Sequence, residues 1–128
     1  MRSRPDPCPC GSGLPYDQCC GPLHRRETAA PTAERLMRSR YAAFVVGDPG
    51  YLLETWHPST RPDRLELEPG IRWTGLEIVG GTGGGMLQRE ATVIFRARYE
   101  AGGRAGAQTE TSRFVREGGR WYYVDGEL

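Results

Sequence analysis

Apolar residues in the first half of the chain recur with the spacing of an amphipathic helix. Between Thr32 and Val46 they are separated by three, four and five positions and define one buried face, made of Leu36, Met37, Tyr41, Phe44 and Val45. Thr32 is a suitable N-cap and Gly47 a suitable end, so a helix is expected over residues 32–46. The arginines of this stretch fall mostly outside the apolar face, and we expect them to be solvated.

A second, shorter helix is expected directly afterwards. Asp48 is a good N-cap, and Pro49 suits the first helical position because the N–H that it lacks would have no partner there. The helix is expected to run to about Trp56. Pro58 stops it, since a residue that precedes proline is disfavoured in the helical region.

From residue 65 onward the pattern changes to the alternation of β-strands. Strands are expected over residues 65–67, 71–79, 86–100, 108–116 and 120–124. The longest of them turns one side toward the core, with Ala91, Val93, Phe95, Ala97 and Tyr99. Glycine-rich turns are expected over residues 80–85, 101–107 and 117–119. Short hairpins between successive strands indicate an antiparallel sheet.

Two helices followed by an antiparallel sheet define an α+β fold. A long, curved sheet wrapped over N-terminal helices makes a cone with a pocket inside, which is the NTF2-like architecture. The chain of 128 residues suffices for one such domain and a short appended segment. No apolar run approaches the roughly 18 residues of a membrane span. The net charge of +1 gives no electrostatic case for nucleic-acid binding, which we do not expect.

The appended segment contains all of the cysteines, which are Cys8, Cys10, Cys19 and Cys20. Four thiols that converge from two short pairs suit a tetrahedral zinc ion. Between the pairs, Pro9 stiffens the chain, and Gly11 and Gly13 allow a tight loop. The segment has too few apolar residues to order itself, and bound zinc could supply the missing stability.

Alternatives to a four-cysteine zinc site remain open. Two disulfides would need either a strained Cys19–Cys20 bond or four crowded sulfurs. No secretory signal follows the N-terminal Met-Arg-Ser-Arg-Pro, so we expect a cytoplasmic location, where thiols stay reduced. A redox role is disfavoured because the spacing is not C-x-x-C. His24 could replace one thiol as the fourth ligand.

The charge of the segment argues against phosphate binding. Residues 1–26 contain four arginines and two aspartates, which leaves a charge of +2. A zinc tetrathiolate contributes about −2 and cancels it. Residues 21–31, which include the end of this segment, contain turn residues and no apolar periodicity. We expect a linker there.

The stretch Cys8-Pro-Cys-Gly-Ser-Gly, completed by Cys19-Cys20-Gly21, resembles the SEC-C motif, a short zinc module first described at the C-terminus of the SecA translocation motor. In that family the ligands are three cysteines and a cysteine or histidine directly after the third. The resemblance therefore implies that Cys8, Cys10, Cys19 and Cys20 are the ligands. It places His24 beside the site and not in the ligand set.

The resemblance extends to the YchJ-like family, bacterial proteins that combine a SEC-C motif with an NTF2-like domain. It rests on the segments Ala-Pro-Thr-Ala-Glu34, Thr55-Trp-His-Pro-Ser-Thr60 and Gly119-Arg-Trp-Tyr-Tyr-Val-Asp-Gly126. It covers nearly the whole chain. The implied organisation is a SEC-C zinc motif over residues 1–26 and an NTF2-like domain over residues 27–128.

The candidate pocket of the cone is a basic and aromatic group formed by Arg38, Tyr41, Trp56 and His57. An aromatic wall beside a histidine and an arginine could bind a small carboxylate, and His57 could titrate near neutral pH. The sequence does not select an acidic partner that would orient His57 as a general base. The alternative is structural, with His57 at a helix end and Trp56 in the core.

Two functional hypotheses follow. The first is a non-catalytic adaptor whose zinc loop contacts a protein or the ribosome, as the SEC-C resemblance implies. The second is a small-molecule-binding or enzymatic cone with its pocket near Trp56 and His57. A hydrolytic zinc centre is disfavoured because four protein ligands leave no position for water. We expect no membrane association, and a homodimer remains open.

Overall fold

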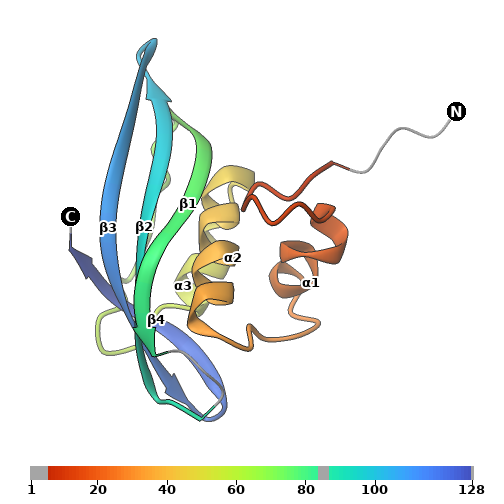
Figure 1. The fold of residues 1–128 in the computed structure, drawn as a ribbon, viewed down its shortest axis with the longest axis vertical. Coiled ribbons are helices and arrows are strands. Elements are labelled where there is room, and N and C mark those ends of the chain that lie inside the picture. Colours follow the sequence, from red (N-terminus) through yellow and green to blue (C-terminus); the bar gives the residue numbers. More distant parts are fainter. Residues whose placement is uncertain (1–5, 84–86, 128) are drawn as a thin grey trace, which may run out of the picture.

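The molecule consists of three layers, namely a curved β-sheet, a helical layer and an N-terminal segment that contains the cysteines (Figure 1). The computed structural model describes residues 6–83 and 87–127. Along the chain the elements are η1 (Tyr16–Gln18), α1 (Cys20–His24), α2 (Ala33–Val46), α3 (Pro49–Glu54), β1 (Ile71–Gly83), β2 (Glu90–Ala101), β3 (Arg104–Glu117) and β4 (Arg120–Glu127). Helix α2 lies between the sheet and the N-terminal segment.

Both predicted helices are present, and their ends are capped as expected. The Thr32 side chain accepts a hydrogen bond from the backbone N–H of Arg35 at 3.1 Å. The helix ends at Gly47, whose φ of 79° is left-handed, a conformation that glycine adopts without strain. The Asp48 side chain accepts from the backbone N–H of Tyr51 at 3.1 Å and so begins α3.

The four strands form one antiparallel sheet in the order β1-β2-β3-β4. The predicted core side of β2 is confirmed, since the residues that alternate along it are buried, namely Ala91, Val93, Phe95 and Ala97. Strands β2 and β3 meet at a tight turn of Gly102 and Gly103, with φ values of 58° and 79°. Because this hairpin is so short, β3 begins at Arg104 and not at residue 108.

Other strand predictions also differ from the structure, and β4 continues to Glu127, beyond the predicted residue 124. Residues 65–67 form no strand, and their two leucines pack half-buried against the core. Strand β1 continues through Gly83, where a turn was expected. A side chain at position 83 would not fit, because its Cβ would lie 2.3 Å from the Glu90 carbonyl oxygen. The glycine is therefore needed for close pairing with β2. Strand β2 begins at Glu90 and not at residue 86; residues 84–86 lie outside the described part.

Two helix predictions also need correction. The linker expected over residues 21–31 contains most of α1, because this segment folds back onto α2. Helix α3 ends at Glu54, before the predicted Trp56. Trp56 forms a bridge with Tyr123 of β4, so pairing with the sheet ends the helix early.

Helix α2 is buried on two sides, which its one-sided apolar pattern did not predict. Leu36, Met37 and Tyr41 belong to the core shared with the sheet. On the other side, Ala42 packs against the cysteines. Phe44 and Val45 were expected in the core, but they are 37% and 39% exposed. That prediction is wrong because the buried contacts of α2 end at Ala43, before the last turn.

Arg40 of α2 is also buried, although the arginines of this helix were expected to be solvated. Its Nη1 donates to the Leu52 carbonyl and to the Thr55 hydroxyl, both at 2.7 Å. Its guanidinium lies 4.3 Å from the ring centre of Tyr123. Burial lowers the pKa of Arg40 to about 10, so it stays charged at neutral pH. Arg40 thus joins α2, α3 and β4.

Candidate metal centre

The four cysteines meet in one buried cluster beside α2. All are free thiols, and the exposed fraction of each is 6% or less. Their sulfur atoms all lie within 4.8 Å of one another. Cys10 Sγ and Cys19 Sγ are 3.6 Å apart. Cys8, Cys10, Cys19 and Cys20 could therefore hold one metal ion between them, as the spacing along the sequence predicts.

The loop that positions the thiols is held by its own backbone. The Cys8 N–H donates to the Leu14 carbonyl at 2.9 Å, and the Gly11 N–H donates to the Cys8 carbonyl at 3.2 Å. Gly11 and Gly13 have φ values of 80° and 88°, which other residues rarely adopt. These turns bring the first cysteine pair back toward the second.

The electrostatics of the cluster favour a bound cation. A hydrogen bond from Cys20 holds the pKa of Cys10 down to about 4, and the same pairing raises the pKa of Cys20. Burial raises the pKa of Cys8. One thiolate is thus stabilised, while further negative charge beside it is disfavoured. A metal ion would bring the positive charge that allows the remaining thiols to ionise.

Two arginines of α2 attach the loop to the helix. Arg38 Nη1 donates to the Cys10 carbonyl at 2.8 Å, and its Nε pairs with Glu34 at 3.2 Å. Arg35 Nη1 donates to Cys20 Sγ at 3.4 Å. Positions 35, 38 and 42 lie on one face of a helix, and the small Ala42 at the third lets the loop approach closely. Sequence reasoning missed this face because it is basic and not apolar.

His24 lies next to the cluster and uses both ring nitrogens elsewhere. Its Nε2 donates to the Ser39 carbonyl at 2.8 Å, so its Nδ1 accepts from the Tyr16 hydroxyl at 2.6 Å. The side chain of Ser39 in turn shares a hydrogen bond of 2.7 Å with the hydroxyl of Tyr51. Burial lowers the pKa of His24, which favours the neutral ring. This arrangement joins α1 to α2 and α3; the resemblance placed His24 beside the site but did not predict these partners.

The candidate pocket residues have separate partners. Arg38 contacts the cysteine loop, whereas Tyr41 packs edge-on against Trp73 at a ring-centre distance of 6.4 Å. Trp56 Nε1 donates to the Thr60 hydroxyl at 3.2 Å. His57 has its own partners: its Nδ1 lies 2.7 Å from the Ser59 hydroxyl and its Nε2 lies 2.9 Å from Glu117. Five surface hollows lined by described residues include none of the four.

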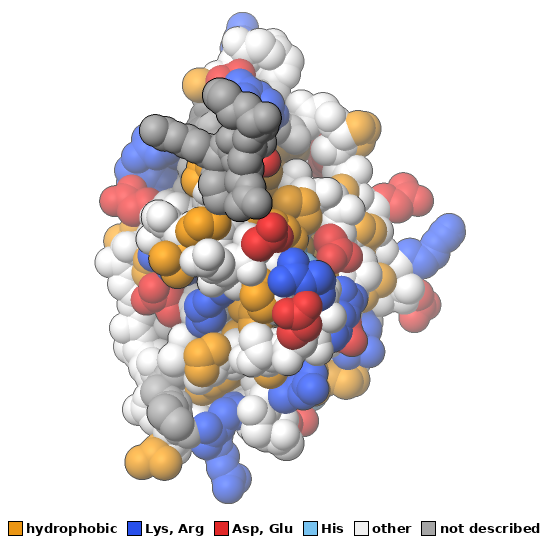
Figure 2. All heavy atoms as spheres, turned by 90° about the vertical axis from the view of Figure 1, so that its right-hand side faces the viewer, with side chains coloured by type: hydrophobic (Ala, Val, Ile, Leu, Met, Phe, Trp, Pro, Cys, Tyr) orange, Lys and Arg blue, Asp and Glu red, His pale blue; other side chains and the backbone are white. Residues whose placement is uncertain are grey.

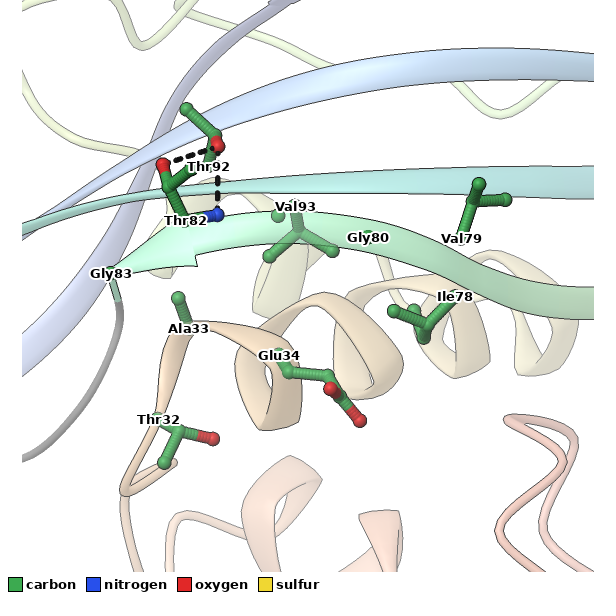
Figure 3. Close-up of a pocket in the computed structure, with 11 residues that line it drawn as sticks. Thr32, Ala33, Glu34, Ile78, Val79, Gly80, Thr82, Gly83, Thr92 and Val93 are labelled. Carbon is green, nitrogen blue, oxygen red and sulfur yellow. Dashed lines mark hydrogen bonds between the residues drawn. The ribbon is translucent and has the colours of Figure 1, made fainter.

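A hollow of about 490 Å³ lies between the first turn of α2 and the end of β1 (Figure 3). Ile78 and Val93 point from the strands toward the helix. The Thr82 and Thr92 hydroxyls bond to each other at 2.8 Å. Glu34, in the first turn of α2, forms an ion pair with Arg38 one turn further along the helix. With these polar groups engaged, the hollow gives no specific argument for a ligand.

The face that carries the N-terminal segment has mixed charge. Figure 2 shows acidic and basic side chains interspersed with apolar ones on this side. Arg25 pairs with Glu27 at 2.7 Å, and Arg26 pairs with Glu54 at 2.6 Å. A surface of mixed sign provides no electrostatic argument for phosphate binding. No helix in the described ranges is long and apolar enough to cross a membrane.

Comparison with family models gives two matches along the chain. A model of the SEC-C motif matches residues 4–22, and a model described as the middle NTF2-like domain of YchJ matches residues 32–126. Fold and cysteine cluster together define a SEC-C protein with an NTF2-like domain. The chain belongs to the YchJ-like family, whose curated relatives are named UPF0225 proteins.

Relatives and solved structures agree with this assignment. A UPF0225 protein of Streptomyces coelicolor is 57% identical, with 95% of each chain covered. One from Streptomyces avermitilis is 55% identical over 98% of this chain and 89% of the relative. The solution structure of a SEC-C motif containing protein, RPA3114 from Rhodopseudomonas palustris, is 37% identical with a TM-score of 0.85, covering 96% of this chain and 98% of that one. The crystal structure of a SEC-C motif containing protein from Psychrobacter arcticus is 32% identical with a TM-score of 0.79. The match covers 94% of this chain and 81% of that one.

Proposed function

We propose that this protein is a zinc-binding adaptor without catalytic activity, in which the SEC-C motif presents a surface to a protein partner. The observation that carries the proposal is the buried cluster of four thiols fixed to α2. A site of this kind builds a rigid surface from a segment with little core of its own.

Zinc is the metal that this donor set favours. Structural zinc sites take four ligands in a tetrahedron, with Zn–S distances of about 2.3 Å, which places the sulfurs about 3.8 Å apart. The 3.6 Å between Cys10 Sγ and Cys19 Sγ is close to that separation. The most distant sulfur atoms are at most 4.8 Å apart, so they would have to approach by about 1 Å to reach the separation of a zinc tetrathiolate.

A closed site argues against zinc catalysis. Catalytic zinc keeps one position for water or substrate, and four cysteine ligands occupy every position. The alternative of a ligand-binding or enzymatic cone near Trp56 and His57 has no specific observation in its favour. His57 is engaged with Ser59 and Glu117, and neither His57 nor Trp56 lines any of the five hollows.

The adaptor proposal can be tested by affinity capture with the full chain. The protein would be presented in its zinc-loaded, chelator-stripped and zinc-reloaded forms to an extract of its own cells. We expect a discrete protein to be retained by the loaded and reloaded forms and lost from the stripped form. Trp56→Phe with His57→Gln is the matched variant, which should retain the partner in full. Equal capture by loaded and stripped protein would contradict the proposal.

A further inference from the structure

The last turn of α2 forms an exposed apolar ridge. Phe44, Val45 and Val46 are 37%, 39% and 48% exposed. Consecutive helix residues are separated by about 100°, so Val45 projects between the other two and the three side chains cover about 200° of the helix surface. The sequence pattern predicts core positions for two of them. Three large apolar side chains in succession at the surface are typical of a binding site.

A hollow adjoins the ridge on the side of the cysteine segment. It has a volume of about 290 Å³ and is lined by Val46 together with Asp6, Pro7, Pro9, Tyr16 and Asp17. The prolines and the tyrosine ring extend the apolar surface of the ridge onto the SEC-C motif. The surface therefore includes residues of both family segments.

A second hollow adjoins the ridge on the side of the sheet. It has a volume of about 230 Å³ and is lined by Phe44 together with Glu66, Leu67, Glu68, Ile71 and Trp73. The Phe44 and Trp73 rings lie 6.2 Å apart, so the ridge continues into aromatic surface here. Glu66 and Leu67, which were expected to lie in a strand, instead contribute to this hollow.

The surroundings of the ridge are acidic. Each hollow is lined by two carboxylates and by no arginine. Among the described residues, only Asp17 of these four acids has an ion pair, with Arg25 at 3.5 Å. The last turn of α2 contains no basic residue, although the C-terminal end of a helix carries partial negative charge. A cation brought to this surface would therefore meet Glu66 and Glu68, which pair with no arginine among the described residues.

We propose that the ridge of Phe44, Val45 and Val46, with its two acidic hollows, binds a polypeptide segment that combines apolar side chains with arginine or lysine. This inference rests on the proposed adaptor function and specifies the chemistry of the partner. Apolar side chains would fill the hollows, and basic side chains would face Asp6, Glu66 and Glu68.

Charge selects this occupant over others. A two-fold dimer places the same patch against itself, so the carboxylates of one copy would face those of the other. Phosphate groups of nucleic acid or of anionic lipid would be repelled by the same side chains. A basic and apolar peptide alone satisfies both features of the surface.

A phage-displayed library of random peptides, panned against the zinc-loaded full chain, tests the proposal. We expect the selected peptides to be enriched in arginine or lysine beside large apolar residues. A synthetic peptide of the selected sequence should bind about tenfold more weakly to Val46→Ser and to Glu66→Gln with Glu68→Gln. Leu87→Ser is the control, because Leu87 is 94% exposed and lies outside both hollows.

The results that would overturn this inference differ from those that would overturn the adaptor function. Selected peptides that are acidic would show that the ridge does not select basic segments. The same conclusion would follow if Leu87→Ser weakened peptide binding as much as the ridge variants do. Sedimentation that reveals a dimer dissociated by Val46→Ser would make the ridge a contact between copies. If zinc-dependent capture from extract persists unchanged in Val46→Ser, the adaptor function stands and this surface is not its site. Zinc-independent binding of basic peptides would leave the ridge proposal intact and contradict the adaptor function.

Discussion

At the scale of single residues, the SEC-C segment is attached to the domain by a few polar side chains. Arg38 holds the Cys10 carbonyl, and His24 donates to the Ser39 carbonyl. These contacts span 28 and 15 positions along the chain. Sequence spacing identified all four thiols because they are local to one loop. It did not identify the side chains that receive the loop, because nothing in a helical pattern shows which face meets a distant segment.

Ser39 provides a test of the hydrogen bonding between α2 and α3. Its hydroxyl donates to the Leu36 carbonyl and is shared with the Tyr51 hydroxyl, both at 2.7 Å in the interior. We expect Ser39→Ala to lower the free energy of unfolding by about 1–3 kcal/mol, because it leaves a buried phenol without its partner. Adding Tyr51→Phe should recover part of that loss, since both polar groups are then removed. Urea unfolding of the single and double variants measures these free energies. Strictly additive losses would contradict an energetic coupling between Ser39 and Tyr51.

His24 predicts the direction of a pH effect. Burial lowers the pKa of His24 below the usual histidine value of about 6.5. The unfolded chain therefore binds a proton more readily than the folded chain, and the free energy of unfolding falls as pH drops through about 6.5. Urea titrations between about pH 7.5 and 5.5 should show a smaller decrease for His24→Gln than for the wild type. An equally steep decrease in the variant would show that other groups cause the effect.

At the scale of elements, the helices and hairpins were predicted better than their burial. Caps at Thr32 and Asp48 depend on neighbouring residues only, so the sequence located both helices. The alternation along β2 likewise gave its core side correctly. The exposure of Phe44 and Val45 could not be predicted, because it depends on where the sheet and the cysteine segment cease to cover α2.

The difference in burial between the middle and the last turn of α2 can be measured through the stability of variants. Leu36 is 2% exposed, whereas Val45 is 39% exposed. Leu36→Ala should lower the free energy of unfolding by about 2–5 kcal/mol, because it opens a cavity in the core. Val45→Ser should cost less than about 1 kcal/mol, because its side chain already contacts water. Equal losses in urea unfolding would mean that the last turn of α2 is covered in solution.

At the scale of the whole molecule, α2 joins two units that the sequence suggests are separate. Residues 1–26 and 27–128 were predicted as a zinc motif and a domain, with a linker between them. In the structure, Ala42 packs against the cysteines while Leu36 packs in the core of the sheet. Helix α2 therefore contacts both the cysteine cluster and the core of the domain. The apolar ridge at the end of α2 lies where both units meet.

X-ray absorption at the zinc K-edge is the most direct test of a closed four-cysteine zinc site. We expect one zinc per chain with four sulfur neighbours at about 2.3 Å. Cys20→Ser should replace one of these sulfurs by a lighter atom. A first shell that contains nitrogen or oxygen in the wild-type protein, from His24 or from water, would contradict such a site, as would a folded preparation without metal.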